Sequence, residues 1–429
     1  MIERIVRGPL LVPLDDGSVA WHPDGALAAD GDGVLVFAGD WNELRTKASI
    51  DSRLVRISDG IILPPLLDIH IHVPQHPIRG GFVDGVPEDI PGGRLLAGLR
   101  RNVFPVEAKC SEIECARGVI EDFRADTLAH GVVGGAAYMT VSAGATEAAL
   151  EMLGPSWSVG LVLMNQNCPE NLRTDEPALD IDMARMAERF GRRLIVTDRF
   201  AVSVDSPLRR RAVELAKRFG LRTQTHLNEQ TGEKRFVEST LYPDIPSYTE
   251  VYLRDGLLDH RCILAHCIHT RPEEWKIIRD SGSVIAHCPT SNLLLGSGVM
   301  PLDEVIEHRI PYALATDVGA SPTVSMLAEM GRFLQVHLGR TARATPSEAL
   351  WRSTLGPAQI LGLEDQFGRL EAARPVSFIE VQPDSTAAAN SADDAIRSIL
   401  PKNLDHPAPV NRVTVAGEIL FEKRGLAHA

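Results

Sequence analysis

The amino-acid sequence predicts an α/β protein in which a TIM-like (β/α)8 barrel is joined to a small β-sandwich domain formed by the N- and C-terminal segments. Three observations predict this fold. From about residue 61, short apolar runs alternate with longer stretches of helical periodicity, which is typical of a parallel sheet with crossover helices. The number of these repeats favours a closed barrel. Strand-like runs without helical patterns occupy both ends of the chain.

The terminal segments are predicted to form strands and hairpins. In the first sixty residues, apolar stretches such as 10–13 and 34–38 are separated by turns that contain Asp-Gly. Strand-like runs return after residue 368, at 376–381 and 413–421. We therefore predict that residues 1–60 and 368–429 form one composite β-sandwich domain, and that residues 61–367 form the barrel as an insertion.

The barrel region contains the predicted βα units in chain order. The strands are short and rich in Val, Ile and Leu, as expected for strands buried on both faces. The helices are longer and alternate apolar with charged positions. The predicted strands lie at residues 61–64, 158–164, 193–196, 262–265, 283–286 and 311–315, and the predicted helices at 110–129, 181–190, 207–219 and 326–338.

Composition excludes several classes of partner. The 44 basic and 57 acidic residues give a formal net charge of −13, which argues against nucleic acid or an anionic membrane as the main partner because phosphate binding needs basic patches. No apolar run approaches the roughly 20 residues of a membrane-spanning helix, and the N-terminus lacks a signal-peptide core. The six cysteines form no C-x-x-C pair, so we expect free thiols in a reducing compartment, the cytoplasm.

Polar residues follow several of the predicted strands, and most of them are histidines. The carboxyl ends of parallel barrel strands open at one common mouth, so residues far apart in the sequence can meet there. Two histidines at i and i+2 on a strand lie on one face and can bind the same metal. Each later residue alone is more often structural, but their repetition in order predicts a metal site. The residues are His70, His72, His226, His266, His287 and Asp317.

The segments that carry these residues resemble the amidohydrolase superfamily. That resemblance depends on residues 68–72, 225–226, 265–266 and 316–317. Within the superfamily, the chain is similar to the guanine deaminase group of purine and triazine aminohydrolases. The narrower similarity depends on residues 71–75, 196–200, 226–229, 286–298 and 315–319.

The resemblance implies a metal-dependent hydrolytic deaminase of an aminated N-heterocycle, with guanine converted to xanthine and ammonia as the leading candidate. Glu229 would transfer protons, and His266 would act with Asp317 to hold and polarise the attacking water. The group also suggests a homodimer. One divalent ion, zinc with Fe2+ as the alternative, would be bound by His70, His72, His226 and Asp317.

The resemblance also implies that Gln75, Arg199 and Phe200 contact the substrate. Arg199 offers planar donors to a carbonyl oxygen, Gln75 offers a donor and an acceptor, and Phe200 offers a ring for stacking. These side chains suit a flat, polar, amide-bearing heterocycle. We therefore expect a small-molecule substrate.

Two questions stay open in the sequence. The strand at 158–164 carries no lysine that could bridge two metals, which favours a single ion. The chain departs from the guanine deaminase pattern at several positions, which include Asp198 in place of proline, His76 in place of an aromatic residue, and Asn165 and Gln166 in place of an acid-base pair. A pterin, 8-oxoguanine or an s-triazine are therefore alternative substrates. A barrel that has lost catalysis and serves as a scaffold is a further alternative, and the complete set of ligands with Glu229 and His266 argues against it.

Overall fold

The computed structural model describes the chain except for residues 91–92, 385–388, 404–408 and 424–429. The described chain divides into two compact units. One unit contains residues 1–68, 125–133 and 324–429, and the other contains residues 69–124 and 134–323.

Strands from both ends of the chain form one mixed sheet in the first unit. Its order is β16-β15-β14-β5-β1-β2-β3, with β4 paired to β1. The C-terminal strand β14 is antiparallel to the N-terminal strand β5, which confirms that the two ends share a sheet. The strands are β1 (Arg4–Pro13), β2 (Val19–Ala29), β3 (Leu35–Asp40), β4 (Val55–Ile57), β5 (Ile61–Leu63), β14 (Phe378–Val381), β15 (Val410–Val415) and β16 (Glu418–Glu422).

Side chains along β2 point alternately to the two faces of this sheet. Ala26 and Ala28 belong to the same buried cluster as Trp41 of α1, whereas Leu27 belongs to a second cluster with Phe378. Successive side chains of a strand point to opposite faces, so both faces of the sheet are covered. The helices of this unit are α1 (Trp41–Lys47), α13 (Met326–His337), α14 (Pro346–Trp351), α15 (Leu355–Leu361) and α16 (Ala392–Ile399).

The second sheet is the predicted parallel barrel. Its eight strands are ordered consecutively from β6 to β13. The backbone N–H of His72 donates to Val318 O, and that of Asp317 donates to His70 O, so the segment after β13 returns to β6 and nearly closes the barrel. The predicted fold class is confirmed, but the run at residues 61–64, predicted as a barrel strand, forms β5 of the first sheet instead. The strands are β6 (Leu66–His72), β7 (Val132–Tyr138), β8 (Trp157–Leu163), β9 (Leu194–Asp198), β10 (Arg222–Leu227), β11 (Cys262–His266), β12 (Val284–His287) and β13 (Tyr312–Leu314).

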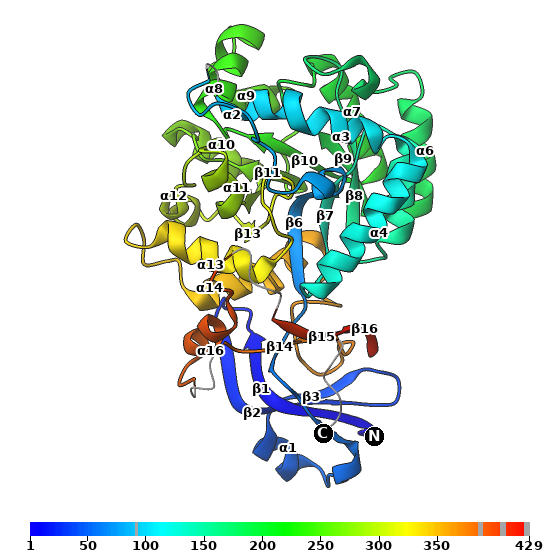
Figure 1. The fold of residues 1–429 in the computed structure, drawn as a ribbon, viewed down its shortest axis with the longest axis vertical. Coiled ribbons are helices and arrows are strands. Elements are labelled where there is room, and N and C mark those ends of the chain that lie inside the picture. The colour runs from blue at the N-terminus through cyan, green and yellow to red at the C-terminus, as the bar shows by residue number, and fades with distance from the viewer. Residues whose placement is uncertain (91–92, 385–388, 404–408, 424–429) are drawn as a thin grey trace. The chain divides into compact units, whose positions relative to one another are not determined.

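Helices lie around the outside of the barrel strands (Figure 1). The side chain of Asp205 accepts a hydrogen bond from Leu208 N at the start of α7, and Gly220 ends that helix in the left-handed conformation. These helices are α2 (Arg94–Gly98), α3 (Phe104–Lys109), α4 (Ile113–Ala129), α5 (Ala143–Met152), α6 (Leu179–Phe190), α7 (Ser206–Phe219), α8 (Thr231–Phe236), α9 (Tyr248–Arg254), α10 (Pro272–Ser281), α11 (Pro289–Leu294) and α12 (Leu302–Glu307).

The predicted helix at 110–129 begins too early. Cys110 is the C-terminal cap of α3, and α4 begins only at Ile113. The sequence analysis also did not predict the short 3-10 and π helices, because such short segments show no hydrophobic periodicity. They are η1 (Ser52–Leu54), η2 (Val73–Ile78), η3 (Leu99–Val103), η4 (Glu170–Leu172), η5 (Gly191–Arg193) and η6 (Val237–Leu241).

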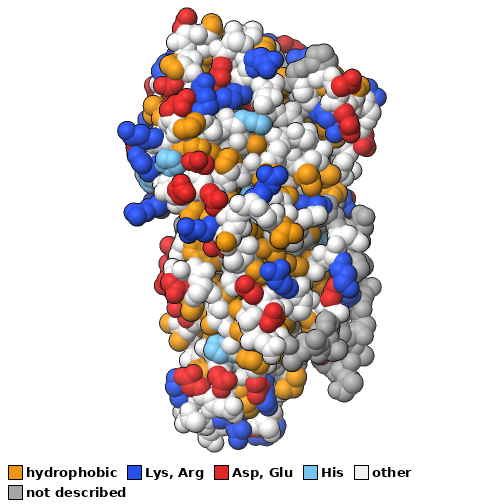
Figure 2. Space-filling model, turned by 90° about the vertical axis from the view of Figure 1, so that its left-hand side faces the viewer, with side chains coloured by type: hydrophobic (Ala, Val, Ile, Leu, Met, Phe, Trp, Pro, Cys, Tyr) orange, Lys and Arg blue, Asp and Glu red, His pale blue; other side chains and the backbone are white. Residues whose placement is uncertain are grey.

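Surface charge is mixed in sign on the face shown in Figure 2. Acidic and basic side chains are interspersed there, so opposite charges lie near one another. Within the described part of the chain, none of the helices combines the length and the apolar character needed to cross a membrane.

Candidate active site

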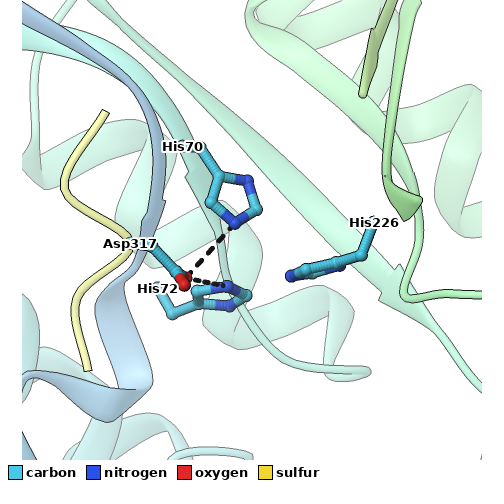
Figure 3. Close-up of side chains that lie close together, drawn as sticks. All are labelled: His70, His72, His226 and Asp317. Carbon is cyan, nitrogen blue, oxygen red and sulfur yellow. Dashed lines mark ion pairs between the residues drawn. The ribbon is translucent and has the colours of Figure 1, made fainter. Parts of the chain in front are cut away.

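Four side chains converge at the carboxyl ends of the barrel strands. His70 and His72 are two positions apart on β6, so their side chains lie on the same face of the strand. His226 lies near the end of β10, and Asp317 follows β13. One ligand atom from each residue lies within 4.8 Å of the others. Figure 3 shows the four side chains close together. Asp317 Oδ1 is 3.3 Å from His70 Nε2 and 3.1 Å from His72 Nε2. The structure thus brings together the four residues that the sequence analysis grouped as metal ligands, whereas His287, at the end of β12, is not one of this group.

The protonation states of three of these residues suit a cation. Burial lowers the pKa of His72 to about 3, and it holds the pKa of His226 well below its usual value. Burial alone would raise the pKa of Asp317, but hydrogen bonds from the two β6 imidazoles outweigh it and keep this pKa well below the ordinary range. Neutral imidazoles and an ionised carboxylate are the donors that zinc binds in proteins. The residues present therefore fit a divalent metal ion.

Neighbouring groups orient two of these ligands. His226 Nδ1 lies 2.7 Å from Arg199 O, and because a carbonyl only accepts, Nδ1 carries the proton and leaves Nε2 as a donor to a metal. Ser291 Oγ donates to Asp317 Oδ2 at 2.5 Å, and Oδ1 is the oxygen that faces the β6 imidazoles. The ligand atoms are thus fixed by hydrogen bonds made on their far sides.

Glu229 and His266 lie beside the four ligands. Glu229 Oε1 accepts a hydrogen bond from Ser297 Oγ at 3.1 Å, and Oε2 is 3.6 Å from His266 Nε2. His266 Nε2 is also 4.0 Å from Asp317 Oδ2, while its Nδ1 lies 2.9 Å from Asn292 Oδ1. Burial and the charge of Asp317 raise the pKa of Glu229 to about 8. At neutral pH this side chain therefore holds a proton that it can donate.

A cavity opens onto these residues, and all three predicted substrate contacts line it. Gln75 lies in η2, Arg199 follows β9 directly, and Phe200 is next in sequence. Apolar side chains from segments that come after β6 in the chain complete the walls. The sequence analysis missed them because they do not lie at the ends of strands. The lining residues are His72, Gln75, Phe82, Leu95, Leu99, Arg199, Phe200, His226, Glu229, Leu295 and Asp317.

Glu107 of α3, which the sequence analysis also missed, joins two of the predicted contacts. Its Oε1 accepts hydrogen bonds from Arg199 Nη1 at 2.5 Å and from Gln75 Nε2 at 2.9 Å. All three side chains are buried. A helical glutamate far from any strand end gives no pattern that distinguishes it from a surface residue.

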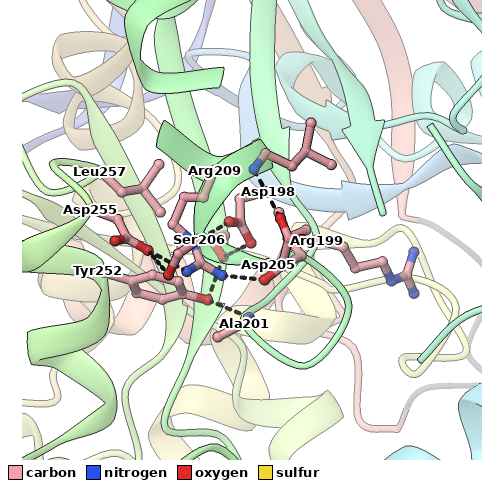
Figure 4. A network of polar contacts seen from close by, with 12 residues as sticks. Asp198, Arg199, Ala201, Asp205, Ser206, Arg209, Tyr252, Asp255 and Leu257 are labelled. Atoms are coloured by element: carbon pink, nitrogen blue, oxygen red, sulfur yellow. Dashed lines mark hydrogen bonds and ion pairs between the residues drawn. The ribbon is translucent and has the colours of Figure 1, made fainter. Parts of the chain in front are cut away.

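A buried polar network supports the end of β9 from behind (Figure 4). Arg209 of α7 reaches Asp198 Oδ2 at 2.6 Å and Asp255 Oδ2 at 2.8 Å, and its third nitrogen donates to Val204 O at 2.7 Å. The side chain of Arg199, the residue after Asp198, points away from this network. Asp198, one of the departures that left the substrate open in the sequence, therefore belongs to the support and does not line the cavity.

The same network reaches His226 through a tyrosine. Tyr252 OH accepts a hydrogen bond from Ala201 N at 3.0 Å and donates to His226 O at 3.0 Å. The hydroxyl of Thr225 also lies 2.9 Å from Tyr252 OH. The ends of β9 and β10, which carry Arg199 and His226, are thereby held together.

A parallel barrel whose strand ends gather three imidazoles and a carboxylate beside a buried proton donor defines a metal-dependent hydrolase. The model of the amidohydrolase family matches residues 61–420, and the chain belongs to this family.

Known proteins similar to this chain include several guanine deaminases. The guanine deaminase of Escherichia coli (strain K12) is 28% identical over 404 residues, which cover 91% of this chain and 90% of that protein. A solved structure of the E. coli enzyme has a TM-score of 0.85 at 26% identity, covering 98% of this chain and 99% of the other. The guanine deaminase of C. acetobutylicum with bound guanine has a TM-score of 0.83 at 24% identity, with 97% and 100% covered, and shows likeness of fold.

A structure with bound zinc shares the fold as well. The atrazine chlorohydrolase TrzN from Arthrobacter aurescens TC1, complexed with zinc, has a TM-score of 0.79 at 19% identity, covering 97% of this chain and 95% of the other. At this identity the comparison concerns the fold alone.

Proposed function

We propose that this protein is a hydrolytic deaminase that converts guanine to xanthine and ammonia. The observation that carries the proposal is that one cavity is lined both by metal-binding side chains with Glu229 and by the polar pair Gln75 and Arg199. The similarity to guanine deaminases over nine tenths of the chain supports guanine over a pterin, 8-oxoguanine or an s-triazine.

We propose one zinc ion per chain as the cofactor, with Fe2+ as the alternative. Among the described residues, His70, His72, His226 and Asp317 are the group of His, Cys, Asp and Glu side chains that could hold an ion. The strand β8 carries no lysine that could bridge a second ion. When bound, such an ion lowers the pKa of water so that hydroxide is available as a nucleophile near neutral pH.

Glu229 supplies and removes protons in this proposal. As the amino-bearing ring carbon becomes tetrahedral, the adjacent ring nitrogen must take up a proton, and the protonated carboxyl of Glu229 faces the cavity to deliver it. The hydroxyl on the tetrahedral carbon then gives its proton to the Glu229 or Asp317 carboxylate, which passes it to the amino group. The C–N bond breaks as the ring carbonyl forms, and ammonia leaves. His266, whose Nε2 lies near both carboxylates, stabilises charge that develops between them.

Gln75, Arg199 and Phe200 orient the base. The Arg199 nitrogens that Glu107 does not engage can donate to the ring carbonyl, and the Gln75 amide can donate and accept on the same edge. Phe200 packs against a flat ring. These contacts distinguish an amide-bearing purine from a ring without a carbonyl.

Steady-state kinetics on the zinc-loaded protein test the proposal. Ammonia release is measured with guanine, a pterin, 8-oxoguanine and an s-triazine, and guanine is expected to have the highest kcat/KM. If another amine is deaminated while guanine is inert, the substrate assignment is wrong although the hydrolase class stands. If zinc is bound at one ion per chain and no amine is turned over, the scaffold alternative is favoured.

We also propose that the protein acts in the cytoplasm as a homodimer. The six cysteines are free thiols in the structure, which supports a reducing compartment. The dimer is supported by the resemblance to the guanine deaminase group, and light scattering of the purified protein tests it.

A further inference from the structure

Arg199 has a permanent partner inside the protein. Its Nη1 is 2.5 Å from Glu107 Oε1, and the side chains of Arg199 and Glu107 are 3% and 2% exposed. A buried guanidinium needs a nearby anion, because removing an unpaired charge from water is costly. In this pocket α3 supplies that anion, so the positive charge of Arg199 is balanced before any ligand arrives.

The same carboxylate fixes the direction of the Gln75 amide. Gln75 Nε2 donates to Glu107 Oε1 at 2.9 Å, and Gln75 Oε1 lies 3.4 Å from Gly319 N, which donates to it. An acceptor on one side and a donor on the other allow only one orientation of the amide. Glu107 is not one of the residues that line the cavity, so it acts through the two side chains that do.

We infer that Glu107 is a specificity-determining residue that restricts this pocket to uncharged, carbonyl-bearing heterocycles and excludes anionic ones. The inference rests on the proposed function, since it takes Gln75 and Arg199 as substrate contacts. An anionic ring placed on Arg199 would lie close to the Glu107 carboxylate and would compete with it for the same guanidinium. A neutral carbonyl oxygen accepts a hydrogen bond from Arg199 without that repulsion.

The substitution Glu107→Gln removes the charge and keeps the size of the side chain. The remaining amide oxygen can still accept a hydrogen bond, but Arg199 then carries an uncompensated charge. The variant is expected to bind anionic ligands better and neutral ligands somewhat worse. A residue that merely supported the fold would weaken both kinds of ligand together.

Calorimetric binding to the zinc-loaded protein measures this difference. The probes are urate, which is an anion at neutral pH, and hypoxanthine, which is neutral. The ratio of the two dissociation constants is expected to shift toward urate by at least about tenfold in Glu107→Gln. Glu107→Asp keeps the charge and is expected to retain the preference of the parent protein. An unchanged ratio in Glu107→Gln would overturn the inference.

A double variant covers the case in which Glu107→Gln folds poorly. Glu107→Gln with Arg199→Gln removes both charges, so the pocket is again uncharged at this point and the gain in urate binding is expected to disappear. A preference for urate that persists in the double variant would also overturn the inference. Because binding is measured without turnover, failure of guanine deamination in the parent protein would count against the proposed function and leave the test of Glu107 intact.

Discussion

Two buried polar clusters of the barrel unit differ in how their charges are balanced. In the ligand cluster of His70, His72, His226 and Asp317, the atoms that converge are all atoms that bind cations (Figure 3). In the Arg209 network, a guanidinium already occupies the centre and its three nitrogens donate to Asp198, Asp255 and a backbone carbonyl (Figure 4).

The comparison separates a binding site from a structural support. A buried network that contains its own cation needs nothing further and stabilises the fold through geometry. A convergent set of neutral imidazoles and a carboxylate is suited to an ion from outside the chain. Variants in the first cluster should therefore affect chemistry, and variants in the second should affect stability.

The largest effect is expected for Asp317→Asn. The amide keeps the shape of the side chain but removes the charge of the ligand cluster, so metal binding should fall well below one ion per chain. Loss of several kcal/mol of charge stabilisation predicts a decrease in kcat of at least about a thousandfold. Elemental analysis and ammonia release check both parts, and full zinc content with normal turnover would contradict the assignment of this residue.

Arg209→Met should have the next largest effect, and it should fall on stability. The substitution leaves Asp198 with the hydroxyl of Thr225 as a partner but without its cation, in a fully buried setting. Removing one partner of a buried ion pair costs about 3–5 kcal/mol. Urea unfolding of the two proteins measures the difference. If Arg209→Met lowers the free energy of unfolding by less than about 1 kcal/mol, the network contributes little to stability.

Glu229→Gln should separate proton transfer from metal binding. The amide keeps the hydrogen bond to Ser297 within reach but cannot deliver a carboxyl proton. We expect zinc content to be unchanged and kcat to decrease at least about a hundredfold, the lower range for general acid–base catalysis. Near-normal turnover would refute the role of Glu229, and loss of zinc would show that it also helps to hold the ion.

The sequence predicted the residues at strand ends and missed those on helices. A metal site could be predicted because a parallel barrel brings every strand end to one mouth, whatever the separation along the chain. The resemblance to the amidohydrolase superfamily then selected His70, His72, His226 and Asp317 as its ligands. Glu107 and Arg209 lie on α3 and α7, and each meets its partner, Arg199 or Asp198, only through its side chain after the helices have packed. A helical glutamate or arginine has the same local pattern whether it is buried or exposed.

Asp198 was one of several departures from the guanine deaminase pattern that left the substrate open in the sequence. In the structure it does not line the cavity, because adjacent residues at a strand end point in opposite directions. The alternation that correctly placed His70 and His72 on one face thus also explains why Asp198 turns toward Arg209. The sequence alone did not indicate that Arg209 on α7 would form an ion pair with Asp198.

The smallest effect is expected for Arg185→Met, a matched control for Arg209→Met. Arg185 also contacts two carboxylates, Glu147 Oε1 and Asp182 Oδ1, both at 2.7 Å, but it is half exposed. Because water screens an exposed ion pair, the free energy of unfolding should decrease by at most about 1 kcal/mol. Added salt should reduce that small loss further and leave the effect of Arg209→Met almost unchanged, because buried pairs are screened much less. Equal losses in the two variants would show that burial does not decide the strength of these ion pairs.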